Sequence, residues 1–366
     1  MAFRIGRGIF DSLEGSASDD IVLGLGGDDI VIGGFGSDWL DGGDGDDIVV
    51  TGAIVSGSLL GGAVFEDTDN DVAFGGAGDD VIISVGGADY IDAGEGGETD
   101  GDLVAVNRSG NTAALRAFGI DSALAPSPTP VFEGQFVVLN DGTAVTNAEH
   151  LRLRGTTMSD TILLANMTSL EETEIFANGG NDVVTTGDSV DSLYGEGGDD
   201  LLSAGAGADS VEGGTGNDTI LAGAGGDYAL GGAGNDLIMG GDGDDAIYGN
   251  AGDDTVIGGA GNDTLGGAEP YAGTRAFDTD TYVGGEGADL FSLMFGAINE
   301  DVIADFDRRE GDSIEIGFNI DIGRDDVEIE LVDRRAGTFN VTVEGEGTHT
   351  FTAVGALVSD VALLVF

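Results

Sequence analysis

A strict nine-residue period runs through residues 177–266. Aligned on aspartate, this stretch divides into ten consecutive nonapeptides without a slip of register, and GGTGNDTIL and GGAGNDLIM are typical copies. Position six is Asp and position eight is apolar in all ten, and position four is Gly in nine, with Ser189 as the exception. Such a period indicates a repeat architecture in which each unit stacks on its neighbours, so it constrains the fold more than any other feature.

The same frame recurs outside this block. Copies such as GLGGDDIVI come before an apolar insertion around residues 51–65, and the frame then resumes with copies such as GGAGDDVII. A worn copy, GTTMSDTIL, carries Asp160 at position six, and GGEGADLFS follows a second insertion that contains Pro270. The position-six aspartates of the clear copies are Asp20, Asp29, Asp38, Asp47, Asp71, Asp80, Asp89, Asp182, Asp191, Asp200, Asp209, Asp218, Asp227, Asp236, Asp245, Asp254, Asp263, Asp280 and Asp289.

This spacing predicts cation sites, and we take all of these aspartates as candidate metal ligands. Gly at positions one, two and four supplies turns with positive φ and leaves carbonyls free to face a cation, while position eight lies in a three-residue strand that faces inward. Two nonapeptides close one coil of 18 residues, so aspartates 18 apart stack on one edge at about 4.8 Å. Unit charges about 5 Å apart repel by roughly 3 kcal/mol at an effective dielectric constant near 20, and we expect bound cations to offset this repulsion.

The charge pattern leaves these aspartates without basic partners. The formal charge is −57, all 12 basic residues are Arg, and none of them lies between Arg7 and Arg108 or between Arg154 and Arg275. Carboxylates and backbone carbonyls make all-oxygen sites, which suit Ca²⁺ better than the strictly octahedral Mg²⁺. The thin apolar core does not offset the entropy cost of ordering Gly-rich coils, so we expect several Ca²⁺ ions to supply much of the folding energy.

The pattern GGxGxDxUx, in which U is apolar, resembles the nonapeptide of the RTX or hemolysin-type calcium-binding family, over roughly half of the chain. This resemblance implies an all-β fold, a right-handed parallel β-roll. It also implies that each Ca²⁺ lies between two turns on the same edge, held by both position-six carboxylates and by carbonyls of the Gly-rich turns. Asp182 would pair with Asp200 in this way, and Asp71 with Asp89. Position-five acids such as Asp199 are expected on solvated faces.

Composition divides the chain into four predicted segments. They are a first β-roll block at 1–98, a β-rich connector or degenerate repeats at 99–176, a second block at 177–292, and a C-terminal cap and secretion region at 293–366. The connector carries four arginines and a Pro-rich patch at 126–130. The runs VEIELV, FNVTVEG and THTFTAVG alternate apolar and polar residues, which predicts an antiparallel β cap.

The segment DFDRREGDSI and the ending SDVALLVF resemble the C-terminal regions of RTX proteins exported by type I secretion. The resemblance implies a secreted or cell-surface protein whose partner is the type I secretion machinery, and it would account for the absence of a signal-peptide-like run at residues 1–15. An ordinary C-terminal strand is the alternative interpretation of this ending.

Catalytic motifs are missing from the sequence. It contains neither HExxH nor GxSxG, and its two histidines, His150 and His349, lie far apart. We therefore predict that the chain is not an enzyme, that it has no membrane span, and that its acidity disfavours nucleic acid. The expected function is extracellular calcium binding with a structural, adhesive or surface-associated role. The alternative is a calcium-dependent accessory or carbohydrate-active protein, with cell-surface glycans as partners and a second function in 99–176.

Overall fold

The computed structural model describes residues 2–58, 61–66, 69–85, 89–94, 102–108, 116–121, 135–139, 144–146, 148–165, 167, 170–267, 279–294, 300–318, 327–333, 338–343, 347–353, 356–357 and 360–365. Within these ranges the chain consists of strands and turns, and no α-helix occurs. None of the described segments could therefore cross a membrane as an apolar helix. The chain divides into two compact units, residues 1–179 with 183–190 and residues 180–182 with 191–366, which are described separately.

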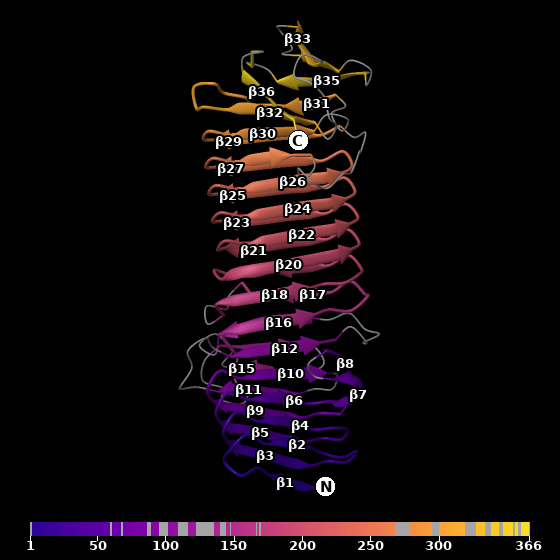
Figure 1. Ribbon diagram of the computed structural model, residues 1–366, viewed down its shortest axis with the longest axis vertical. Coiled ribbons are helices and arrows are strands. Elements are labelled where there is room, and N and C mark those ends of the chain that lie inside the picture. The colour runs from indigo at the N-terminus through magenta and orange to yellow at the C-terminus, as the bar shows by residue number, and fades with distance from the viewer. Residues whose placement is uncertain are drawn as a thin grey trace. The chain divides into compact units, whose positions relative to one another are not determined.

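Unit 1 contains two parallel sheets (Figure 1). One sheet pairs, in order, β1 (Phe3–Ile5), β3 (Ile21–Gly26), β5 (Trp39–Asp44), β9 (Val72–Ala77), β11 (Tyr90–Gly94) and β15 (Ala144–Thr146). The other pairs β2 (Ser12–Glu14), β4 (Ile30–Ile32), β6 (Ile48–Val50), β10 (Val81–Val85), β12 (Leu103–Asn107), β16 (His150–Arg154) and β18 (Glu172–Phe176).

Unit 1 also contains strands outside this regular order. The first group is the parallel set β13 (Arg116–Asp121), β17 (Thr161–Leu163) and β19 (Val183–Thr185). β14 (Gln135–Leu139) runs antiparallel to both β13 and β15, and β7 (Ala53–Ser58) forms an antiparallel hairpin with β8 (Gly61–Glu66). The described part of 99–176 thus adds β15 to the first parallel sheet of this unit and β12, β16 and β18 to the second.

Unit 2 is more regular. Its first parallel sheet consists of β21 (Leu201–Ala206), β23 (Thr219–Ala224), β25 (Leu237–Asp242), β27 (Thr255–Ala260), β29 (Thr281–Glu286), β31 (Asp301–Ile303) and β35 (Gly347–Ala353). Its second consists of β20 (Val190–Gly197), β22 (Ser210–Thr215), β24 (Tyr228–Ala233), β26 (Ala246–Ala251), β28 (Thr264–Gly266), β30 (Leu290–Met294), β32 (Ser313–Phe318) and β36 (Val361–Val365).

The register follows the repeat. Thr219 on β23 pairs with Leu237 on β25, exactly one coil of 18 residues further along the chain. This confirms the predicted all-β fold built on parallel sheets, in which successive nonapeptides alternate between two edges. Strands such as β23 are six residues long rather than three, because the pairing with the next coil continues through positions one to three of the following nonapeptide.

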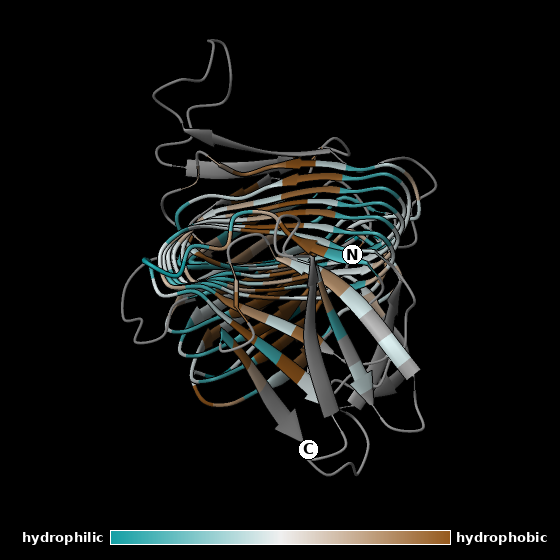
Figure 2. Cartoon of the chain, turned by 90° about the horizontal axis from the view of Figure 1, so that it is seen from above, coloured by the Kyte–Doolittle hydropathy of each residue, from teal (hydrophilic) through white to brown (hydrophobic). Residues whose placement is uncertain are grey.

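The core lies between the two sheets of each unit. Position-eight side chains face inward, and Ile220, Ile238 and Val256 are fully buried, as predicted. Figure 2 shows the chain from above. Brown, hydrophobic segments lie mainly on the strands, and teal, hydrophilic segments lie mainly at the turns.

The alternating runs near the C-terminus form antiparallel strands, in agreement with the sequence. β33 (Val327–Asp333), β34 (Thr338–Val343) and β35 are antiparallel neighbours. The final strand behaves differently, because β36 lies parallel to β32 and continues the sheet of the roll.

Candidate metal site

All of the predicted aspartate ligands lie in equivalent places. Each stands directly before a strand, except Asp191, which lies within β20. None of the 19 is more than 3% exposed, so these carboxylates point into the roll rather than into solvent. A buried carboxylate needs hydrogen bonds or a cation to compensate for lost hydration. Each set of position-six residues stacked on one edge is called here a ladder, and each member is a rung.

At most rungs, one carboxylate oxygen is held by the neighbouring coil. The backbone N–H of Asp200 donates to Oδ1 of Asp218 at 2.8 Å, and the N–H of Asp218 donates to Oδ1 of Asp236 at 2.8 Å. The same bond spans the first insertion, where the N–H of Asp38 donates to Oδ1 of Asp71 at 2.7 Å. The aspartates that the resemblance pairs, such as Asp182 with Asp200, are therefore neighbours, joined by a bond from backbone to side chain.

The second carboxylate oxygen is different. In the part of the chain that the structure describes, this buried Oδ2 has no hydrogen-bond partner at Asp29, Asp47, Asp80, Asp200, Asp209, Asp218, Asp227, Asp236, Asp245, Asp263 and Asp289. Leaving one buried polar atom unsatisfied costs about 1–3 kcal/mol, and more when the group is charged. A buried oxygen without a hydrogen-bond partner that recurs from coil to coil indicates that a further ligand binds at these rungs.

The Oδ2 atoms converge with backbone carbonyls on a defined space. A Cβ atom at Gly213, position one of its nonapeptide, would lie 2.4 Å from Oδ2 of Asp218 and 2.6 Å from the carbonyl oxygen of Gly231. Gly195 faces the equivalent pair of oxygens. A Cβ atom there would lie 2.4 Å from Oδ2 of Asp200 and 2.5 Å from the carbonyl oxygen of Gly213. The missing side chain thus leaves room for two oxygen atoms, a carboxylate oxygen with a negative charge and a carbonyl oxygen with a partial one.

This finding corrects one sequence expectation. Positive φ occurs at positions two and four, for example +108° at Gly214 and +127° at Gly216, but not at position one. Gly213 continues the extended strand, so its role is to make space beside the carboxylate rather than to permit a left-handed turn.

The ladder electrostatics favour a bound cation. Burial raises the pKa of the Asp209 carboxyl to about 7, and the neighbouring carboxylates of Asp191 and Asp227 add to the rise. Burial likewise raises the pKa of Asp236 to about 6 and that of Asp263 to about 7. Both causes disfavour the charged carboxylate, and a cation beside Oδ2 would reverse them.

The available ligands fit calcium. They are carboxylate and carbonyl oxygens without His or Cys, which is the donor set of a hard cation. Among the described residues, no group of three or more His, Cys, Asp or Glu side chains gathers in one place. A Ca²⁺ ion at the ladder would therefore take carboxylates from one or two rungs and complete its shell with backbone carbonyls and water.

Position-five side chains form a second series of hydrogen bonds between coils, on the exposed side of the turns. The N–H of Asn217 donates to Oδ1 of Asp199 at 2.8 Å, and the N–H of Asn235 donates to Oδ1 of Asn217 at 2.8 Å. The solvent exposure of Asp199 was expected from the sequence, but this hydrogen bond between coils was not. Position-five side chains thus hold adjacent turns together on the outside.

Four further rungs were not predicted from the sequence. Asp102, Asp301 and Asp312 accept a backbone N–H through Oδ1 as regular rungs do, from Asp80, Asp280 and Asp289. At the N-terminal end, the N–H of Asp11 donates to Oδ1 of Asp29 at 2.7 Å. Their nonapeptides have lost most glycines, and the remaining signal is an Asp two residues before an apolar strand position, as in FDSLE, GDLVA, EDVIA and GDSIE.

Parallel sheets, Gly-rich turns and buried acidic ladders together define a β-roll protein of the calcium-binding class. The family described as RTX calcium-binding nonapeptide repeat (4 copies) matches residues 5–40, 23–53, 67–97, 174–202, 194–229, 203–238 and 230–265. The chain therefore carries RTX-type calcium-binding nonapeptide repeats in these residues, as its sequence pattern indicated. No curated protein matches it significantly.

Proposed function

We propose that the position-six rungs bind Ca²⁺ through Oδ2 and that these ions drive folding of the coils. The observation that carries this proposal is the repeated buried Oδ2 without a hydrogen-bond partner, as at Asp218 and Asp236. The bond from the neighbouring N–H satisfies only Oδ1. A ligand that binds the folded state alone stabilises it by mass action, so each occupied rung adds to the stability of the coils on both sides.

The setting that suits such sites is outside the cell. Sites with few carboxylates and several carbonyls resemble the weaker class of calcium modules, with dissociation constants of about 10⁻⁴–10⁻³ M, which are found in extracellular proteins. Export by type I secretion, which the C-terminal resemblance implies, would take the chain from calcium-poor cytosol to a calcium-rich exterior. Folding would then occur on arrival.

The proposed role is structural, adhesive or surface-associated. RTX repeats are typically structural rather than catalytic, and the prediction that the chain is not an enzyme remains part of this proposal. The described part of 99–176 contributes β12, β16 and β18 to a parallel sheet. No observation in that described part favours the alternative of a carbohydrate-active or accessory function with glycan partners.

A calcium titration of the full chain tests the proposal. In chelator we expect an expanded chain by circular dichroism and small-angle scattering, and millimolar Ca²⁺ should compact it cooperatively, with Mg²⁺ much less effective. A chain that is equally folded in chelator and in calcium would refute the mechanism.

A pair of variants makes the test specific to position six. Asp218→Asn keeps the Oδ1 that accepts the N–H of Asp200 but removes the charged Oδ2. It should raise the calcium midpoint by up to about tenfold, equivalent to ~1.4 kcal/mol, yet stabilise any folded state in chelator. Asp199→Asn, the matched control at exposed position five, should change the midpoint far less, because it removes a neighbouring charge but no buried Oδ2. Equal effects of the two variants would show that position six does not provide the ligands.

A further inference from the structure

Asp89 differs from the interior rungs, such as Asp218, because its second carboxylate oxygen, Oδ2, already accepts a hydrogen bond. Oδ1 of Asp89 accepts the N–H of Asp71 at 3.1 Å, as in any rung. Its Oδ2, however, accepts a hydrogen bond from the Ser84 hydroxyl at 2.6 Å. Ser84 occupies position one of this nonapeptide, the place where Gly195 and Gly213 leave open space. The serine side chain therefore fills the space in which other rungs present Oδ2 to a ligand.

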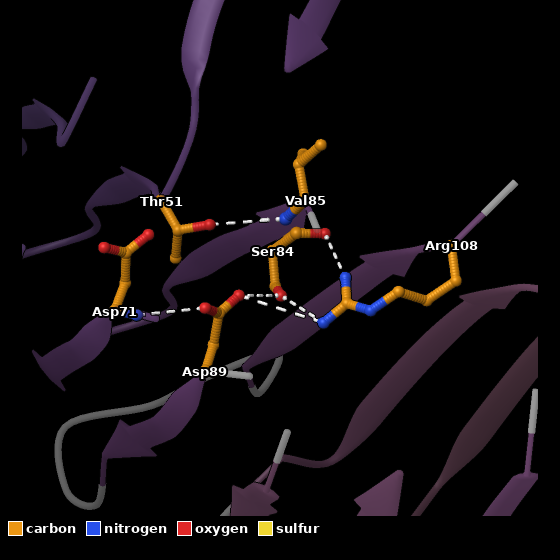
Figure 3. A network of polar contacts seen from close by, with 6 residues as sticks. All are labelled: Thr51, Asp71, Ser84, Val85, Asp89 and Arg108. Carbon is orange, nitrogen blue, oxygen red and sulfur yellow. Dashed lines mark hydrogen bonds and ion pairs between the residues drawn. The ribbon is translucent and has the colours of Figure 1, made fainter. Parts of the chain in front are cut away.

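A buried guanidinium completes this rung (Figure 3). Arg108 is only 1% exposed, and its Nη2 lies 3.8 Å from Oδ2 of Asp89 and donates to the Ser84 hydroxyl at 3.2 Å. Its Nη1 donates to the Ser84 carbonyl oxygen at 3.4 Å, so that carbonyl is also engaged. The positive charge that a cation would bring to the carboxylate is already supplied by the protein.

Asp280 in unit 2 reaches a similar state by another route. Tyr282 stands at position eight, where the repeat normally carries an aliphatic residue, and its hydroxyl donates to Oδ2 of Asp280 at 2.9 Å. A Cβ at Gly267 would lie 2.4 Å from this Oδ2 and 2.7 Å from the Tyr282 hydroxyl, whereas at Gly258 the second oxygen is the carbonyl of Gly284. The phenol hydroxyl thus stands where a regular rung places a carbonyl ligand.

The Tyr282 hydroxyl makes this bond in a buried setting, because the side chain is only 1% exposed. Solvent does not compete for the bond, so Oδ2 of Asp280 is already engaged by the chain's own donor.

From these contacts we propose that Asp89 and Asp280 are calcium-free rungs, closed by the chain's own donors while the interior rungs take Ca²⁺. At Asp89 a divalent cation would meet the like charge of Arg108, and at Asp280 it would have to displace a hydrogen-bonded hydroxyl. Asp20 shares part of this pattern through Ser16, at 2.7 Å, but Ser16 is exposed, so solvent and ions can compete there. The inference rests on the proposed calcium binding of the other rungs.

Positions one and eight of the nonapeptide distinguish the two kinds of rung. Position one is Gly or Ala at regular rungs such as Asp218 and Asp227, so a Ser there marks a closed rung. A Tyr at position eight marks another. Because these rungs need no ion, each unit contains at least one ladder position that is complete before calcium arrives, and the number of bound ions is smaller than the number of position-six aspartates.

The test compares matched Asp→Asn variants of the full chain, with bound calcium counted by equilibrium dialysis and the midpoint measured by calorimetry. Asp236→Asn removes an Oδ2 that has no hydrogen-bond partner and should lose at least one ion. Asp280→Asn keeps an Oδ1 for the N–H of Asp254 and should leave the ion count unchanged and the midpoint within about twofold, equivalent to ~0.4 kcal/mol. If Asp280→Asn loses calcium as Asp236→Asn does, the proposal is overturned.

A reciprocal variant should create a site. Ser84→Gly with Arg108→Gln restores the open position one and removes the guanidinium charge, so this double variant should bind one more ion than the parent chain. Circular dichroism at saturating calcium confirms that the variant is folded, and a folded variant with an unchanged ion count would contradict the inference at Asp89. A parent chain that binds no calcium would instead remove the proposed function itself.

Discussion

At the scale of single residues, protons and calcium compete for the same buried oxygens. The free carboxyl group of Asp in an unfolded chain has a pKa near 3.9. In the folded coils burial raises the pKa of Asp80 and Asp209 to about 7, and that of Asp47 to about 6. The calcium-free folded state therefore binds more protons than the unfolded state between about pH 4 and pH 7.

The sign of the pH effect follows from this difference. Without calcium, the stabilising effect of protonation is fully present below the unfolded pKa and disappears as pH rises through about 7, so the chain should be more folded at pH 5 than at pH 8. With calcium present, the calcium midpoint should rise as pH falls below about 6, because protons displace the ion. Circular dichroism in calcium-free buffers measures the first effect, and calcium titrations at several pH values measure the second.

Substitution separates the buried rungs from the many other acidic groups. Asp209→Asn should reduce the pH dependence of calcium-free folding between pH 5 and pH 8, whereas Asp199→Asn at the exposed position five should reduce it much less, because burial is the larger cause of the raised pKa of Asp200 and Asp218. A pH profile that neither variant changes would mean that rung protonation does not control this equilibrium.

At the scale of elements, insertions leave the ladder uninterrupted. The bond from Asp38 to Asp71 spans 33 residues, whereas that from Asp20 to Asp38 spans 18, so the first insertion adds 15 residues to the coil. Strands β5 and β9 nevertheless pair directly, with Trp39 opposite Val72. The antiparallel hairpin β7–β8 within the insertion pairs only with itself among the described strands.

Deletion of Ala53–Asp67 removes these 15 residues and restores the regular spacing. We expect the shortened chain to keep its calcium count and to melt within a few degrees of the parent chain in calcium, since loop closure entropy depends weakly on loop length. Deletion of Thr219–Ala233, which has the same length, is the control. It should destroy the calcium-bound fold because 15 is not a multiple of the period. Similar losses from both deletions would give the hairpin a structural role.

Features that are set within one nonapeptide can be predicted from the sequence. Strand positions and rungs such as Asp218 are of this kind, because they follow from the nine-residue period. The long β23 and the final parallel strand β36 do not, because their lengths and partners are set by neighbouring coils. The contact between Asp89 and Arg108 joins two coils across an irregular stretch, so no spacing rule reveals it.

At the scale of the whole molecule, the charge of −57 governs the state without calcium. The Debye length shrinks from about 30 Å at 0.01 M salt to about 3 Å at 1 M, so added salt screens repulsion among the carboxylates. We expect the radius of gyration in chelator to contract markedly when NaCl is raised over this range. The calcium-bound chain is the control, and its radius should change little. Equal salt responses in the two states would show that charge repulsion does not expand the calcium-free chain.

Within unit 2 the hydrogen bonds between coils run in both directions. A position-six carboxylate such as Asp218 receives its N–H from the coil before it, and a position-five side chain such as Asp199 receives one from the coil after it. Every regular coil therefore offers the same two faces, and any coil fits on any other. Recombination that duplicates or removes the coding sequence of one coil would change the height of the stack by about 4.8 Å and would keep every hydrogen bond between adjacent coils. The length of such a protein can therefore change in fixed steps while its fold stays the same.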